Sequence, residues 1–123
     1  MTELTPVQRV PGTSRLIEVR ISTPDADTAQ ALATDIVDRH LAACVQILGP
    51  ITSIYSWKGE THQALEWLML AKTTAEMFDD ISELVTSQHP YDVPEVIAVT
   101  VRHVLDEYGA WVRDVVHGPD LDE

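Results

Sequence analysis

The sequence predicts one α+β domain with a ferredoxin-like, split β-α-β antiparallel sheet, helices on one face, an extended β-ribbon and a C-terminal helix. Three observations lead to this fold class. Hydrophobic periodicity gives the order strand, helix, strand, strand, helix, strand, helix. The two central strands are long and meet at Lys58-Gly59. A chain of 123 residues, 45% of them hydrophobic, has enough apolar surface for one core.

The first strand and helix are expected within residues 15–41. Apolar and polar residues alternate over residues 15–22, which is the period of a strand with one covered face. Thr23-Pro24-Asp25 is typical of a helix start, with the threonine hydroxyl as the cap. The apolar residues that follow recur at helical spacing. We therefore expect a helix that packs on a sheet.

The ribbon is expected within residues 41–73. Gly49-Pro50 indicates a bulge rather than a strand end, because proline cannot donate to a ladder and glycine weakens a strand. Arms of roughly 10 to 14 residues would extend about 40 Å, which is more than a domain of this size can shield. We therefore expect another copy of the chain to cover part of the ribbon. The alternatives are a protrusion like that of a two-domain protein and a strand that folds back within its own sheet.

Two tryptophans belong to this expected contact between copies. Trp57 and Trp67 are placed near opposite positions across the ribbon and are expected to pack in the interface. A stacking platform for a ligand is the alternative.

The remaining elements are expected within residues 73–117. Thr73 to Glu76 has the spacing of a capping box, and the helix that follows should end at His89-Pro90. Residues 95–104 predict a strand with the apolar positions 97, 99 and 101 on one side. A short amphipathic helix should begin at Asp106.

Composition limits the partners and the location. The net charge of −12 disfavours nucleic acid and anionic membranes as partners. No segment approaches the roughly 18 apolar residues of a membrane span, and the N-terminus lacks the apolar run of a signal peptide, so we expect a cytoplasmic protein. Residues 1–13 are expected to form a flexible tail, 14–117 the domain and 118–123 an acidic tail.

The segment HPYDVPE, residues 89–95, is the densest candidate for chemistry. A divalent metal would favour His89 with Asp92 or Glu95, because imidazole and carboxylate together suit copper, zinc or nickel. Another subunit or water would have to complete such a site. In the alternative reading, His89 caps the preceding helix while Tyr91 and Glu95 hydrogen-bond the loop. The sequence holds no phosphate-binding loop and no nucleophile motif, so we predict a protein that is not an enzyme.

Four motifs in order resemble the CutA family of divalent-cation tolerance proteins. The resemblance runs from about Ile17 to Val116. Its motifs are Ala42-Ala43-Cys44-Val45, Thr52-Ser53-Ile54-Tyr55 with Trp57 and Gly59, Lys72-Thr73, and His89-Pro90-Tyr91 with Pro94-Glu95. The resemblance implies a ferredoxin-like protomer in a homotrimer, a role in tolerance of copper and other divalent cations, and a design shared with the PII signalling proteins.

The resemblance also implies two kinds of site. One binds Cu²⁺ or another divalent cation, although Ile21 stands where copper-binding members carry a cysteine and Gln88 where they carry a further histidine. The other is an intersubunit cleft for a small ligand. Its lining is Tyr55, Glu66, Lys72 and Tyr91. For Lys72, which needs a carboxylate or carbonyl partner among apolar neighbours, a structural ion pair is the alternative.

Overall fold

A computed structural model describes residues 14–118, so the predicted tail at 1–13 and all of the predicted acidic tail at 118–123 except Gly118 lie outside the described residues. The elements follow the predicted order. They are β1 (Leu16–Thr23), α3 (Ala26–Asp38), β2 (Cys44–Trp57), β3 (Glu60–Thr74), a 3₁₀ turn (Ala75–Met77), α4 (Phe78–Gln88), β4 (Val96–Thr100) and α5 (Asp106–His117). The sheet has the order β2-β3-β1-β4, and all three strand pairs are antiparallel. This topology confirms the predicted ferredoxin-like fold.

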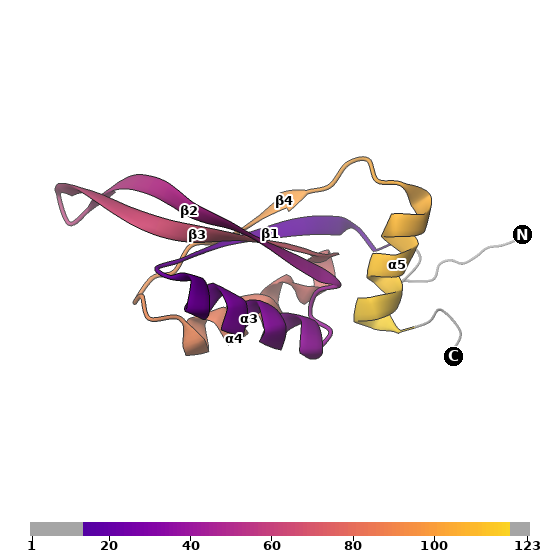
Figure 1. The fold of residues 1–123 in the computed structure, drawn as a ribbon. Coiled ribbons are helices and arrows are strands. Elements are labelled where there is room, and N and C mark those ends of the chain that lie inside the picture. The colour runs from indigo at the N-terminus through magenta and orange to yellow at the C-terminus, as the bar shows by residue number, and fades with distance from the viewer. Residues whose placement is uncertain (1–13, 119–123) are drawn as a thin grey trace, which may run out of the picture.

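The core lies between the sheet and the two helices α3 and α4, which cover the same face (Figure 1). Val19 and Ile21 of β1 and Met69 of β3 are fully buried there, as the alternation in β1 predicts. Ile36 of α3 and Ile81 of α4 meet them from the helical layer. No helix in the described part of the chain has the length and apolar character needed to cross a membrane.

The ribbon formed by β2 and β3 is long, as expected, and it extends beyond the helices (Figure 1). Its strands pair from Cys44 opposite Lys72 to Trp57 opposite Glu60, with a register shift between Leu48 and Ile51. This shift confirms the bulge predicted at Gly49-Pro50.

The placement of the two tryptophans corrects one expectation. Trp57 pairs with Glu60 at the ribbon tip, whereas Trp67 pairs with Thr23 of β1 and packs partly against the core. The two rings therefore do not lie opposite each other, because the turn at Lys58-Gly59 sets a register that separates them. Trp67 packs within its own chain, and an interface role for Trp57 stays a prediction.

The predicted helix caps are wrong at both helix starts. Asp25, not Thr23, caps α3, because its Oδ1 accepts the Thr28 amide at 2.7 Å. The Thr23 hydroxyl donates to the carbonyl groups of Asp25 and Trp67 instead.

The capping box expected before α4 does not form either. Thr73 donates to the carbonyl of Leu41 at 2.6 Å, and Thr74 shares a hydrogen bond with His117 of α5 at 2.8 Å. Both hydroxyls therefore make tertiary contacts, and the chain enters α4 through the 3₁₀ turn.

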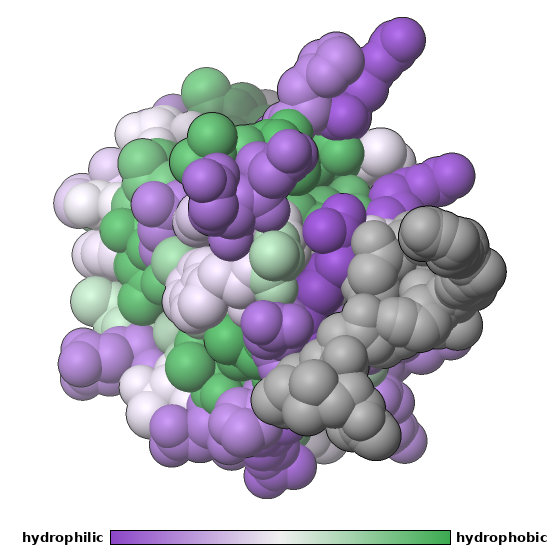
Figure 2. All heavy atoms as spheres, turned by 90° about the vertical axis from the view of Figure 1, so that its right-hand side faces the viewer, coloured by the Kyte–Doolittle hydropathy of each residue, from purple (hydrophilic) through white to green (hydrophobic). Residues whose placement is uncertain are grey.

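The last strand and the last helix leave apolar surface uncovered. β4 is shorter than predicted, and its apolar residues Ile97 and Val99 face away from α3 and α4, where they are 48% and 40% exposed. The helix α5 stands at one end of the sheet and anchors there through fully buried Val112 (Figure 1). Figure 2, which views this end, shows hydrophobic side chains at the surface among hydrophilic ones.

Candidate functional site

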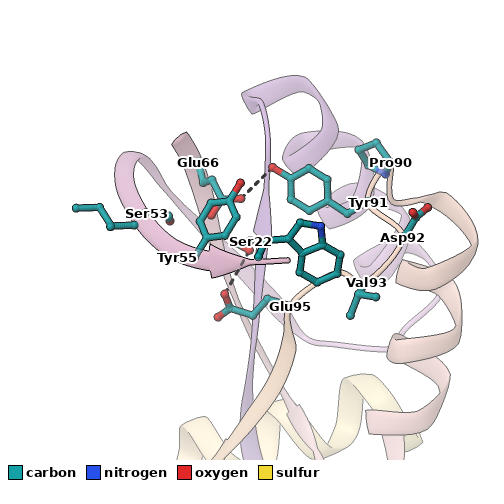
Figure 3. A pocket seen from close by; sticks show the side chains of 11 residues that line it. Ser22, Ser53, Tyr55, Glu66, Pro90, Tyr91, Asp92, Val93 and Glu95 are labelled. Carbon is teal, nitrogen blue, oxygen red and sulfur yellow. Dashed lines mark hydrogen bonds between the residues drawn. The ribbon is translucent and has the colours of Figure 1, made fainter. Parts of the chain in front are cut away.

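A pocket of about 610 Å³ lies where the loop after α4 meets the ribbon (Figure 3). We call it the loop–ribbon pocket. Its lining residues are Ser22, Ser53, Ile54, Tyr55, Trp57, Glu66, Pro90, Tyr91, Asp92, Val93 and Glu95. Three of these side chains are carboxylates and none is Lys, Arg or His. The lining therefore offers negative charge to whatever enters.

His89 shapes the loop side of the pocket from a buried position. Its Nε2 lies 2.7 Å from the carbonyl oxygen of Ser22, and its Nδ1 accepts the amide N–H of Tyr91 at 3.1 Å. Because Nδ1 accepts, the ring proton must be on Nε2, which donates to Ser22. Both ring nitrogens are therefore engaged within the fold. His89 holds the loop against β1. Its ring contacts the Tyr91 ring in a tilted arrangement, with centroids 4.9 Å apart.

Tyr91 joins the loop to the ribbon. Its hydroxyl donates to Oε2 of Glu66 at 3.0 Å, and Figure 3 shows this bond spanning the pocket. Burial first, and then the hydrogen bond and charge of Glu66, raise the pKa of Tyr91 to about 12. The phenol therefore stays a neutral donor at physiological pH.

Glu66 is a buried carboxylate for which the described part of the chain provides no counter-charge. Only 6% of its surface is exposed. Among residues 14–118, the Tyr91 hydroxyl is its hydrogen-bond partner and no Lys, Arg or His forms an ion pair with it. Burying a charge with a single neutral partner costs folding free energy. Of the three carboxylates in the pocket, Glu66 would therefore gain most from a bound cation.

The other predicted metal ligands lie nearby but do not complete a site. Glu95 accepts the Ser22 hydroxyl at 3.4 Å, and Asp92 also lines the pocket. Within the described chain, however, no three His, Cys, Asp or Glu side chains form a group that could hold a metal ion. A divalent cation would need further ligands, as the sequence led us to expect.

Lys72 lies outside the loop–ribbon pocket, and the intersubunit cleft that it was predicted to line with Glu66 stays a prediction. Its Nζ bonds Oε2 of Glu18 at 2.8 Å and the Gln46 amide oxygen at 2.9 Å. The Lys72 ammonium, followed by Arg20, holds the pKa of Glu18 below its ordinary value. The structure thus gives Lys72 the ion pair that was the alternative, and six residues of strand, about 20 Å, separate it from Glu66.

Some residues of the pocket escaped the sequence analysis. Ser22 bonds Glu95 through its hydroxyl and His89 through its carbonyl, yet in the sequence it is merely one polar position of an alternating strand. Ser53 and Ile54 were noted as part of a family motif but not as lining residues, and Val93 carried no signal of its own.

Known proteins resemble this chain in sequence and in fold. The family model described as "CutA1 divalent ion tolerance protein" matches residues 17–115. The chain belongs to this family. The divalent-cation tolerance protein CutA of Thermus thermophilus is 41% identical over 78% of this chain and 93% of its own length. Human protein CutA is 40% identical over 77% of this chain, which spans about half, 53%, of the human protein.

A solved structure agrees with this assignment. CutA1 of Oryza sativa superposes with a TM-score of 0.83 and 33% identity, over 88% of this chain and 99% of the other. The family model and the Thermus thermophilus relative are named for tolerance of divalent ions.

This CutA chain departs from the copper-binding pattern at Ile21 and Gln88, and both side chains make other contacts in the fold. Ile21 is fully buried in the core, and the Gln88 amide donates to Asp35 of α3 at 2.9 Å. With both nitrogens of His89 engaged as well, a copper ion at these positions would have to displace packing or hydrogen bonds that the fold uses. Copper binding stays a prediction.

Proposed function

We propose that this CutA family member is a non-enzymatic protein that binds a divalent cation in the loop–ribbon pocket. The observation that carries the proposal is the buried carboxylate of Glu66, which has no ion-pair partner among residues 14–118, in a pocket that Asp92 and Glu95 also line. Copper is the ion that the family resemblance implies. A ligand set of carboxylate oxygens also suits harder ions such as Mn²⁺.

We further propose that the cation binds to an assembly, which the family resemblance predicts to be a trimer. Two features support this proposal. The ligand set of a single chain is incomplete over residues 14–118, and the apolar side chains of β4 face outward. A second copy that covers this sheet face would bury the apolar side chains and bring additional groups to the pocket.

Isothermal titration with Cu²⁺ and with Mn²⁺ tests the cation site. Glu66→Gln keeps the shape and the Tyr91 hydrogen bond but removes the charge, so the affinity should fall by about tenfold or more. Glu83→Gln is the matched control, because it removes one charge from an exposed position of α4 outside the pocket. Absence of binding by the unaltered protein, or equal affinity in the two variants, would reject the proposal.

A second candidate is a small-molecule site in the same pocket, of the kind that the PII-like design implies. The volume of about 610 Å³ favours it, because such a volume lies within the range of small-molecule sites and far exceeds that of a bare ion. An anionic ligand is disfavoured, because Lys72 pairs with Glu18 rather than facing the pocket.

A further inference from the structure

The walls of the loop–ribbon pocket combine aromatic rings with carboxylates. Tyr55 and Trp57 come from β2 and Tyr91 from the loop after α4. These rings are 43%, 46% and 37% exposed, so each has a surface available to a ligand. Aromatic faces attract cations through their quadrupole, and cages of such rings recognise organic ammonium groups.

The rings are held in place by their own neighbours. Tyr55 stacks on His62 across the ribbon, with centroids 5.5 Å apart and planes 20° apart. Tyr91 is fixed by its hydrogen bond to Glu66 and by the tilted contact with His89. Such contacts orient the walls before a ligand arrives, which reduces the entropic cost of binding.

The remaining lining distinguishes an organic cation from a metal ion. Ile54 and Val93 present apolar groups to the same space, and these groups cannot coordinate a metal. They can pack against methyl or methylene groups. Glu66 supplies a buried negative charge that one neutral hydroxyl does not compensate. A weakly hydrated cation with an apolar surface matches both features.

We propose that the loop–ribbon pocket binds an organic ammonium ion, with the Glu66 carboxylate as the counter-charge and Tyr55, Trp57 and Tyr91 as the walls around the cationic head. This inference rests on the proposed function insofar as the pocket is a cation site, and it names a ligand class that the tolerance of divalent ions does not include.

Titration of the full chain with choline and with 3,3-dimethylbutan-1-ol tests the inference without any mutation. The alcohol has the shape of choline with a neutral carbon in place of the ammonium nitrogen. Choline should bind, and the alcohol should bind about tenfold more weakly or not at all, because it gains neither the ring quadrupoles nor the Glu66 charge. Equal affinities, or no binding of choline, would overturn the inference.

Variants separate the organic site from the metal site. Trp57→Leu should weaken choline binding about tenfold and Mn²⁺ binding much less, because an indole ring is not a metal ligand, whereas Trp57→Phe should retain most of the choline affinity. Glu66→Gln should lower the affinity for both choline and Mn²⁺, and Glu83→Gln should change neither affinity. Sedimentation of each variant checks that its assembly is that of the unaltered protein.

The two proposals fail in different ways. Binding of Mn²⁺ or Cu²⁺ without choline leaves the proposed function and overturns the inference. Binding of choline without either metal ion does the reverse. If a second copy of the chain fills the pocket in the assembled protein, choline will not bind, and that outcome also overturns the inference.

Discussion

Glu66 and Tyr91 form a pair in which each side chain sets the properties of the other. Tyr91 supplies the hydrogen bond that the buried Glu66 carboxylate needs, and Glu66 in return opposes ionisation of the phenol. The segment HPYDVPE was predicted to carry chemistry, and its aromatic and acidic members do line a pocket. Both ring nitrogens of His89 are engaged within the fold, and its role as a metal ligand stays a prediction.

The raised pKa of Tyr91 predicts a loss of stability in alkali. Because the folded-state pKa of about 12 exceeds the ordinary value of 10, the folded protein retains a proton that the unfolded chain releases. The stabilisation is fully present below about pH 10 and is lost as the pH rises towards about 12. Urea unfolding from about pH 9 to about pH 12 should therefore show a decline in the free energy of unfolding that Tyr91→Phe makes shallower.

Glu66→Gln provides the control for this measurement. It removes the charge but not the burial, which is the largest cause of the shift, so the pKa of Tyr91 should move only part of the way back to 10. An unaltered alkaline slope in Tyr91→Phe would show that other groups cause the decline.

At the scale of single residues, the sequence indicated several of the side chains that line the pocket but not how they pair. Lys72 and Glu66 share a strand face, yet six residues separate them, and Lys72 finds Glu18 across the sheet. Such pairing depends on the register between strands that are distant in the sequence. The alternation of side chains along one strand shows which face a residue occupies but does not define that register.

The ribbon is the element that carries one wall of the pocket, and its bulge positions that wall. At the bulge, Gly49 lies directly under the indole of Trp67, so closely that a Cβ atom added there would overlap the ring. The glycine thus allows Trp67 to pack against the core while β2 changes register beside it.

Gly49→Ala should destabilise the fold by about 1–3 kcal/mol, because the added methyl group must displace Trp67 or the strand. The midpoint of urea unfolding measures the effect. Gly59→Asn is the comparison: beyond the chain neighbours no atom lies within 4 Å of a Cβ placed there, so its smaller loss should come only from the strain of φ +81°, which asparagine bears better than most residues. Equal losses of unfolding free energy in the two variants would contradict the close contact between Gly49 and Trp67.

Element types and their order were predictable because the strand and helix periods differ clearly along this chain. The residues at which the elements begin and end were less predictable. Thr23, Thr73 and Thr74 are all good capping residues, but their hydroxyls bond groups on other elements. A local preference for capping loses when a tertiary partner is available, and the sequence does not show that partner.

The whole molecule exposes apolar surface on the sheet face that α3 and α4 leave open. Ile97 and Val99 of β4 and Leu48 of β2 are each at least 40% exposed on that face. The terminal helix does not cover it, because α5 anchors at the end of the sheet through Leu16, Ala43 and Val112. An exposed apolar face of this kind favours a specific contact with a second copy, whereas the net charge of −12 opposes non-specific association.

Ile97→Glu should dissociate the assembly without unfolding the protomer. The new carboxylate lies opposite Arg20 of β1, so the single chain can accommodate it, whereas an apolar interface cannot. Sedimentation velocity should show at least about a tenfold weaker association. Thr34→Glu adds the same charge on the exposed side of α3 and should leave the assembly intact. A stable 13.7 kDa particle for the unaltered protein would contradict the assembly itself.

The outer part of β3 has one further mechanical consequence. Residues 60–66 pair with β2 alone in the described sheet, since the contact with β1 begins at Trp67. Among the described residues, the hydrogen bond from Tyr91 to Glu66 is the one that ties this outer part of the ribbon, about 20 Å long, to the loop after α4. Because the tie lies near the base of the outer part, a small displacement of Glu66 would become a larger one at Lys58-Gly59.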